Sequence, residues 1–117
     1  MTSTVHDPME LLRNTLEERF QWHTDRLTEL TMYSRRPDLG GYPRDTLTER
    51  IATSRRAITD TAQALRRMAE GTYGRCERCT AAIPLHQLQI MPHTRLCARC
   101  RRTEPRSVAT VLRLGGG

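Results

Sequence analysis

The most conspicuous absence in this sequence is lysine. All 19 residues counted as Lys or Arg are arginines, and against 13 acidic residues they give a formal net charge of +6. Aromatic residues are also scarce at 4%, and 37% of the 117 residues are hydrophobic. This composition offers little material for a compact core, so we expect a metal site or a long helical pairing to help hold the fold.

Long apolar runs are absent as well. No run approaches the roughly 20 residues of a membrane span, and the N-terminus lacks the apolar stretch of a signal peptide. We therefore expect a cytoplasmic protein that is not associated with a membrane. In a reducing cytosol, four cysteines in two C-x-x-C pairs indicate metal ligands before they indicate disulfides.

The charge divides the chain into unlike parts. Residues 7–70 hold 11 arginines and 11 acidic residues, whereas residues 71–117 hold eight arginines and two acidic residues. We interpret residues 7–70 as a mixed-charge helical hairpin with a tip loop at 35–45. Residues 71–102 form a basic module, and residues 103–117 a short helix, expected from about 105 to 114, and a flexible tail.

The first helix is predicted to run from Pro8 to about Ser34. Asp7 can cap it, and proline suits the first helical position. Its apolar stripe, with one histidine, recurs at spacings of three and four, as in an amphipathic helix. The stripe consists of Leu12, Leu16, Phe20, His23, Leu27 and Leu30.

Prolines and glycines between residues 37 and 43 interrupt the helical pattern. The stretch Thr46–Glu49 resembles a capping box and predicts the start of a second helix, which Gly71 ends. Residues 51, 58 and 65, and residues 47, 54, 61 and 68, follow a heptad pattern. The sequence therefore predicts an antiparallel two-helix coiled coil of about 40 Å, at about 1.5 Å per residue. Its length is either incidental or serves to carry the loop far from the rest of the protein.

The cysteines form two knuckles, Cys76-x2-Cys79 and Cys97-x2-Cys100, separated by 17 residues. Two such knuckles supply four thiolates for a tetrahedral Zn²⁺ site with no open position, so we predict one structural zinc. A redox dithiol usually opens a helix in a βαβ context, and ferredoxin clusters tend to use other spacings. His86 and His93 lie between the knuckles and are interpreted as surface residues.

Arginines crowd both knuckles. They can offset the negative charge of a zinc–tetrathiolate centre, bind phosphate or contact an acidic protein surface, and the sequence does not rank these roles. The five are Arg75, Arg78, Arg99, Arg101 and Arg102.

The stretch from Ala64 to Cys100 resembles the DksA/TraR family of bacterial zinc-finger transcription regulators. The shared features are a helix ending in G-T-Y-G, the Ile83-Pro84 step, the Leu88 to Pro92 segment and the spacing of the two knuckles. The resemblance implies a regulator, not an enzyme, that binds RNA polymerase directly and inserts its hairpin into the secondary channel. It implies a monomer without direct DNA binding, and in some members the regulator works together with ppGpp.

In the family, acidic residues at the hairpin tip act near the catalytic magnesium. The frequent tip string D-x-x-D-x-A does not occur here, and the resemblance leaves Asp38, Asp45 and Glu49 as the tip candidates. The alternative function is a basic zinc finger that binds nucleic acid and uses the hairpin to dimerise. A zinc–thiolate centre that releases its metal on oxidation is compatible with the polymerase-binding regulator.

Overall fold

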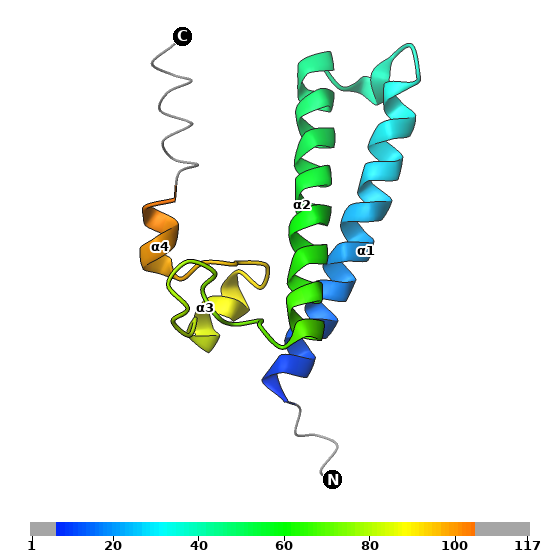
Figure 1. Ribbon diagram of the computed structural model, residues 1–117. Helices are drawn as coiled ribbons and strands as arrows, with labels where there is room; N and C mark the ends of the chain where they lie inside the picture. Colours follow the sequence, from blue (N-terminus) through cyan, green and yellow to red (C-terminus); the bar gives the residue numbers. More distant parts are fainter. Residues whose placement is uncertain (1–6, 105–117) are drawn as a thin grey trace.

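The structure is a computed structural model that describes residues 7–104. Its elements follow in the order α1 (Pro8–Ser34), a 3-10 turn η2 (Leu39–Gly41), α2 (Arg44–Glu70), α3 (Leu85–Ile90) and α4 (Ala98–Arg102). Figure 1 shows α1 and α2 side by side as a hairpin, with the segment after α2 folded beside the end opposite the tip. The predicted helical hairpin followed by a four-cysteine module is confirmed. The helix expected from 105 to 114 lies outside the described residues.

Within residues 7–104, no helix is long and apolar enough to cross a membrane.

The first helix begins where the sequence places it. The Asp7 carboxylate accepts a hydrogen bond from the Met9 N–H at 3.3 Å, and Pro8 occupies the first turn, where its missing N–H costs nothing. Of the predicted stripe, Leu12, Leu16 and Leu30 are buried, and its other members are half-buried. The side chains that face α2 are therefore buried to different extents along the length of α1.

The second helix begins two residues before the expected capping box, so that prediction is wrong. Pro43 is extended at ψ 146°, and its carbonyl accepts the N–H of Leu47 at 3.0 Å. The first turn thus forms from Arg44, and no side chain caps it. Asp45, which we placed at the end of the tip loop, lies in that first turn, where its charge favours the positive end of the helix dipole.

Of the two heptad rows of α2, the row with the smaller and more polar residues is the more deeply buried. Leu47, Ser54 and Thr61 are buried, while the isoleucines and leucine at 51, 58 and 65 are half-buried. The Thr61 hydroxyl donates to the carbonyl of Ala57 at 2.7 Å, which satisfies it within the helix. These small side chains fill little of the seam, so the apolar core gathers at the two ends of the hairpin.

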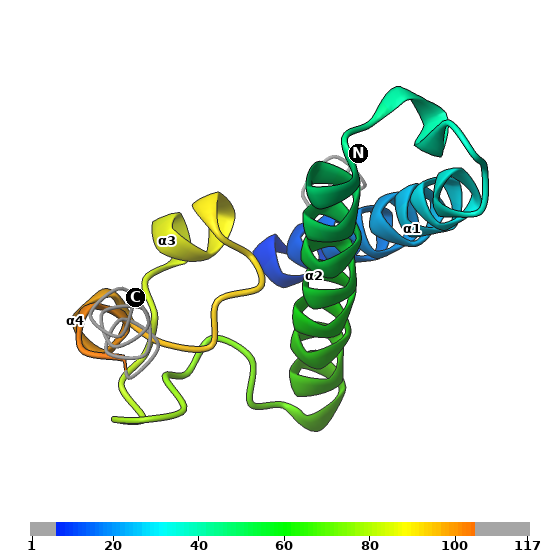
Figure 2. The same cartoon turned by 90° about the horizontal axis from the view of Figure 1, so that it is seen from above.

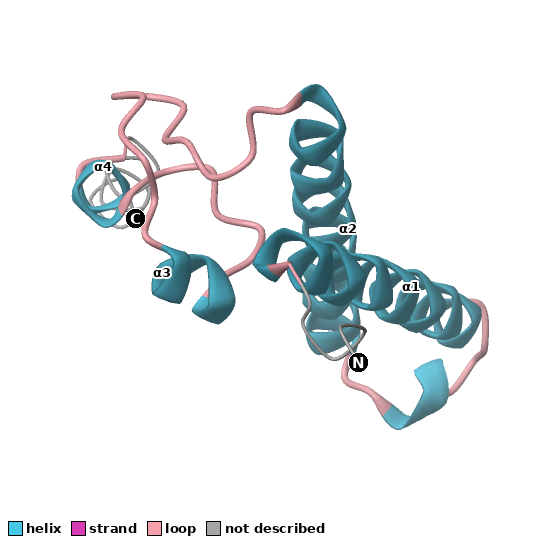
Figure 3. Ribbon diagram, turned by 90° about the horizontal axis from the view of Figure 1, so that it is seen from below, coloured by secondary structure: helices cyan, strands magenta, loops and turns pink. Residues whose placement is uncertain are grey.

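The larger core lies at the base of the hairpin and belongs to both parts of the chain. One cluster joins residues of α1 and α2 to the segment that carries the cysteines. Figures 2 and 3 show this segment and α3 curling beside the N-terminal end of α1. The hairpin and the cysteine module are therefore packed together. The cluster comprises Leu12, Leu16, Ala64, Tyr73, Cys76, Ile83, Leu88, Leu96 and Cys100.

The turn between α2 and the module is set by Gly71. This residue is left-handed at φ 80°, and its N–H donates to the Met68 carbonyl at 3.2 Å, while the Thr72 N–H donates to the Arg67 carbonyl at 2.9 Å. These bonds satisfy the last carbonyls of the helix. The prediction that Gly71 caps α2 is confirmed.

The tip is closed by a turn that requires glycine. Gly40 has φ 63°, and a Cβ there would lie 2.5 Å from Cγ of Tyr33. The rings of Tyr33 and Tyr42 lie 5.9 Å apart, one on each side of this turn. Any larger residue at position 40 would displace the Tyr33 ring.

Candidate functional site

The first knuckle is a tight backbone loop that turns the Cys76 and Cys79 sulfurs to one side. The Cys76 N–H donates to the Ala81 carbonyl at 2.8 Å, and the Thr80 N–H donates to the Cys76 carbonyl at 2.9 Å. The Cys79 N–H points at the Cys76 sulfur, 3.5 Å away. Backbone amides aimed at a sulfur stabilise its thiolate form, which is the form that binds metals.

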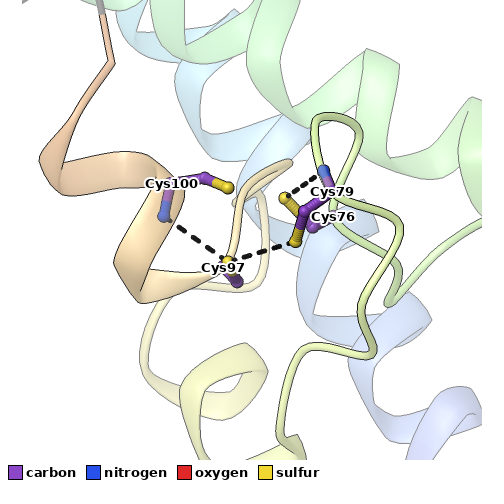
Figure 4. Close-up of side chains that lie close together, drawn as sticks. All are labelled: Cys76, Cys79, Cys97 and Cys100. Atoms are coloured by element: carbon purple, nitrogen blue, oxygen red, sulfur yellow. Dashed lines mark hydrogen bonds between the residues drawn. The ribbon is translucent and has the colours of Figure 1, made fainter.

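The second knuckle repeats this arrangement at the start of α4. Cys97 is the N-cap of α4, and its sulfur accepts the N–H of Cys100 at 3.5 Å. The Glu77 N–H donates to the Arg95 carbonyl at 2.9 Å, so backbone hydrogen bonding links the two knuckles directly. Figure 4 shows the four cysteine side chains converging on one small region.

The spacing of the sulfurs fits one zinc ion. All four sulfurs lie within 4.8 Å of one another, and those of Cys79 and Cys97 are 3.8 Å apart. A tetrahedral Zn²⁺ site with Zn–S bonds of about 2.3 Å requires sulfurs about 3.8 Å from each other. The four cysteines are thus positioned to bind one metal ion, which confirms the predicted zinc cofactor. The zinc is structural, since four thiolates leave no open coordination position on the ion.

Without a cation these thiols cannot all ionise. Burial acts to raise the pKa of Cys76, but hydrogen bonds from surrounding backbone N–H groups outweigh it and lower that pKa to about 6. Burial and hydrogen bonds with the neighbouring sulfurs raise the pKa of Cys100 to about 12. A divalent cation removes this conflict because it offsets the charge of all four thiolates, and its binding releases protons.

Thr80 closes the first knuckle in a conformation that suits glycine. Its φ is 63°, in the left-handed region, where a β-branched residue is strained by about 1–2 kcal/mol. Its hydroxyl makes a short hydrogen bond to the Cys79 carbonyl. Position 80 therefore requires left-handed backbone, and the threonine adopts it at an energetic cost.

Arg67 ties the metal module to the hairpin, and the sequence reasoning missed it. Its side chain is buried, and its guanidinium donates to the carbonyls of His93 and Thr94, both at 3.3 Å. It also lies 3.7 Å from the Glu77 carboxylate. Burial lowers the pKa of Arg67, and the nearby Glu77 opposes that shift. Nothing in the pair Arg66-Arg67 distinguishes the buried arginine from the exposed one except its place on the core-facing side of α2.

Tyr73 makes a second tie. Its ring is buried in the shared core, and its hydroxyl donates to the Pro92 carbonyl at 2.8 Å. The tyrosine of the G-T-Y-G string thus holds the far side of the metal module. The G-T-Y-G string, in the segment that resembles the DksA/TraR family, marks Tyr73 in the sequence. It does not reveal that the Tyr73 hydroxyl bonds to Pro92.

His93 is not the surface residue that we expected. It is half-buried where the module meets α1 and α2, and burial lowers its pKa, with Arg19, Arg67 and His23 adding to the effect and Asp60 opposing it. His86 is exposed, as expected. His23 is half-buried on the seam, and burial and Arg19 lower its pKa.

The five arginines around the knuckles fall into two groups. Arg75 donates to the Thr80 carbonyl at 3.4 Å, Arg78 to the Thr103 carbonyl at 3.3 Å, and Arg101 to the Thr94 hydroxyl at 3.3 Å. These three therefore brace the metal module. Arg99 and Arg102 are exposed, and neither has a hydrogen bond or ion pair with another residue of the described part of the chain.

The three candidate acidic residues of the tip have different surroundings. The Asp38 carboxylate accepts the N–H of Gly40 at 3.0 Å and lies 3.5 Å from the Arg36 Nε, so it already serves the turn. Asp45 and Glu49 are exposed and lie one turn apart at the start of α2, on the same face of the helix.

Comparison with known proteins agrees with this geometry. Residues 71–106 match the family described as "Prokaryotic dksA/traR C4-type zinc finger". The solved structure of transcription factor DksA2 from Pseudomonas aeruginosa aligns with a TM-score of 0.68, covering 86% of this chain and 85% of that chain at 24% identity. At this identity the match demonstrates a common fold.

A curated relative shares a shorter segment. An uncharacterized protein of Aquifex aeolicus (strain VF5) is 43% identical over 49 residues. The matched segment is 42% of this chain and 34% of the relative, so it spans about a third of the relative's length.

Proposed function

We propose that this chain, whose residues 71–106 match the DksA/TraR zinc-finger family, regulates transcription by binding RNA polymerase directly, with its hairpin inserted tip-first into the secondary channel. One observation carries the proposal. A zinc finger of the DksA/TraR type is packed onto the base of a helical hairpin whose tip lies at the opposite end. Each helix has 27 residues, which is about 40 Å at about 1.5 Å per residue.

The joint between hairpin and finger supports this mode of action. The shared core, the Arg67 hydrogen bonds and the Tyr73 hydrogen bond fix the finger against the base of the hairpin. A hairpin that enters a channel has to be stiff. A zinc finger fixed at the base of the hairpin sets how far the tip penetrates. Zinc stabilises that finger and carries out no chemistry in this proposal, since its four ligands are all cysteines. In this proposal the protein acts as a regulator and not as an enzyme, and it binds polymerase as a monomer.

The finer proposal for the tip assigns its action to carboxylates. Asp45 and Glu49 project from the first turns of α2, and Asp38 lies across the turn beside Gly40. An acidic group brought near a catalytic magnesium, or near a basic mobile element, alters the local charge balance. Asp45 is a better candidate than Asp38 because no side-chain hydrogen bond or ion pair holds it within residues 7–104, whereas Asp38 serves the turn.

Asp45→Asn separates docking from tip action. It preserves the shape of the side chain and removes its charge, so polymerase affinity should stay within about twofold of the original. The effect on open-complex lifetime should be lost. Asp38→Asn is the matched comparison, because it perturbs a carboxylate already committed to the turn. If Asp45→Asn retains the full effect on lifetime, the carboxylate of Asp45 is not the acting group.

The finer proposal for the body assigns polymerase contact to the exposed arginines Arg99 and Arg102. For ppGpp at the polymerase interface, the candidate place is a hollow of about 330 Å³ between α2 and the finger, which is lined by four arginines and two carboxylates: Arg56, Arg67, Arg95, Arg101, Asp60 and Glu104. Arginine provides planar, bidentate contacts to phosphate. Titration of ppGpp into the purified complex, compared with the chain alone, would show whether the nucleotide requires the interface.

Direct binding is tested by mixing the purified, zinc-loaded chain with purified RNA polymerase core after nuclease treatment. Co-elution of the two on size exclusion supports the proposal. Loss of co-elution on nuclease treatment, together with binding of the chain to free nucleic acid, would support the alternative of a nucleic-acid-binding zinc finger.

A further inference from the structure

We propose that the side of the hairpin centred on Trp22 is the surface that docks against a folded protein partner, here the wall of the polymerase channel. This inference rests on the proposed function, and it names the surface on which the binding energy is concentrated. It concerns the stem of the hairpin, which shares Glu49 with the tip candidates, and the zinc finger lies outside it.

Trp22 is exposed to an unusual degree. It is the only tryptophan of the chain, and 62% of it is accessible although it lies in the middle of a 27-residue helix. Its one aromatic neighbour among the described residues is His23, whose ring meets it edge-on at 5.1 Å. Exposed tryptophans are costly to leave in water, and tryptophan, tyrosine and arginine are the residues that dominate protein interfaces energetically.

Two adjacent hollows flank Trp22. One, of about 360 Å³, lies over the seam between Trp22 on α1 and Ser54 on α2. The other, of about 590 Å³, is lined by α1 residues on the Trp22 side and by Arg50 of α2. Both are lined by Trp22, Arg26 and Arg50, so these three side chains form the ridge between them. The first hollow exists because the small Ser54 occupies a heptad position where a larger apolar residue would fill the seam.

The arginine beside Trp22 is held in place before any partner arrives. Arg26 donates to the Glu29 carboxylate at 2.8 Å and to the Tyr42 hydroxyl at 2.9 Å. The Tyr33 hydroxyl donates to the other oxygen of Glu29 at 3.0 Å, and Arg50 lies over the Tyr42 ring at 5.8 Å. A side chain that is already ordered loses little entropy when it is buried at an interface.

This network extends the Trp22 surface toward the tip. Residues 22, 26, 29 and 33 follow each other at spacings of four, three and four, so they form one stripe on α1. Tyr42 joins the stripe from the tip segment through its bond to Arg26. Three of the five aromatic residues of the chain thus belong to the distal half of the hairpin, which is the half that tip-first insertion would bury.

The charge of this surface favours protein over nucleic acid. Its two arginines are outnumbered by three carboxylates in the linings of the hollows, those of Asp25, Glu29 and Glu49. A polyanion would be repelled by that balance, since phosphate binding requires a basic surface. Mixed charges around an aromatic anchor are instead typical of the rim of a protein interface. The hollows, each more than ten times the volume of about 30 Å³ that one water occupies, have room for partner side chains.

The first test compares Trp22→Ala with Met32→Ala in the full-length, zinc-loaded chain. Met32 is on the same helix, is 60% exposed and lines neither hollow. Because interface hot spots lose at least about thirty-fold in affinity on truncation to alanine, Trp22→Ala should weaken polymerase binding by about that factor. Met32→Ala should stay within about threefold. Circular dichroism and melting should be unchanged for both, because both side chains are exposed.

The second test observes Trp22 itself. Because the chain has one tryptophan, 5-hydroxytryptophan incorporation labels this site alone and can be excited where the tryptophans of polymerase do not absorb. Acrylamide should quench the free chain strongly and the polymerase complex several-fold less. The inference would be overturned if Trp22→Ala and Met32→Ala bound polymerase with equal affinity, or if quenching in the complex equalled that in the free chain. Either result would leave the proposed function standing. Failure of the unmodified chain to bind polymerase overturns both. Protection of Trp22 from quenching in a dimer of the chain alone, before polymerase is added, would also overturn the inference. The surface would then be occupied by a second copy of this chain.

Discussion

The joint between the zinc finger and the hairpin should depend on Arg67 more than on any other charged side chain. Arg67→Ala removes two hydrogen bonds to the buried carbonyls of His93 and Thr94. Hydrogen bonds to charged groups contribute about 1.5–3 kcal/mol each, and the 3.3 Å lengths place these two at the lower end, about 3 kcal/mol together. The ion pair with Glu77 adds little, because that carboxylate is 46% exposed and well screened.

The assay is urea unfolding of the zinc-saturated protein followed by far-ultraviolet circular dichroism. With a slope of about 1–3 kcal/mol per molar urea, a loss of about 3 kcal/mol lowers the midpoint by about 1–3 M. The neighbouring Arg66→Ala removes the same charge from the same helix but touches solvent only, so it should cost less than about 0.5 kcal/mol. Arg67→Lys should fall between them, because an ammonium cannot reproduce the planar fork of the guanidinium. Equal midpoints for Arg67→Ala and Arg66→Ala would refute the reasoning.

Three further predictions concern the zinc finger and its contact with the hairpin. The chain should bind one Zn²⁺, and Cys97→Ser should abolish zinc binding in a metal assay. The finger should then unfold while a helical hairpin remains, because structural zinc contributes on the order of 10 kcal/mol to the folding of its module. Unaltered zinc content in Cys97→Ser would contradict the site. Thr80→Gly should raise the free energy of unfolding by up to about 1 kcal/mol, because it relieves left-handed strain. A lower free energy of unfolding in urea would show that the hydrogen bond of the threonine hydroxyl contributes more than the strain costs. The folded-state pKa of His93 lies below its ordinary 6.5, so the unfolded chain binds the proton more readily and stability should fall as the pH drops from 6.5 through the lowered value. His93→Gln should flatten this part of the plot of urea midpoint against pH, and an unchanged slope would show that His93 does not cause the pH dependence.

Local patterns in the sequence were enough to predict the two long helices and the metal ligands, but not the short helices α3 and α4. The spacing of Leu12, Leu16 and Leu30 predicts a helix because only one side of it can be buried, and the structure buries these three. Likewise the four cysteines indicate one ion, because two C-x-x-C loops place two sulfurs each on a single turn. The helix depends on residues close together in the chain, and the metal site depends on a short motif that occurs twice.

The start of α2 shows where local signals compete. The capping pattern at Thr46–Glu49 is genuine as a string, but Pro43 already turns the chain, and the dipole favours Asp45 in the first turn. Once the helix has begun at Arg44, Thr46 lies in its first turn, and the N–H groups of residues 48 and 49 that its hydroxyl would cap already bond within the helix. A cap signature therefore marks a helix end only when no earlier start is available.

The contacts between hairpin and finger could not be predicted because they join distant segments. Arg67 and Thr94 are 27 residues apart, and Tyr73 and Pro92 are 19 apart. No periodicity links such positions, and the pair Arg66-Arg67 contains one exposed and one buried arginine of identical chemistry. The partial burial of His93 follows from the same packing. The Trp22 surface was missed for a related reason, since Tyr42 and Arg50 reach it only when the tip folds back.

The most direct test of the account places a photo-crosslinking amino acid at Arg44, the exposed first residue of α2, and at Arg102 on the finger. Each variant is irradiated with purified RNA polymerase in the absence of nucleic acid, and the crosslinked peptides are mapped. The account predicts that position 44 crosslinks to segments around the polymerase active centre, and that position 102 crosslinks at the channel mouth. Crosslinks from position 44 to the outer surface of polymerase, or a complex in which neither position crosslinks to the channel, would contradict it.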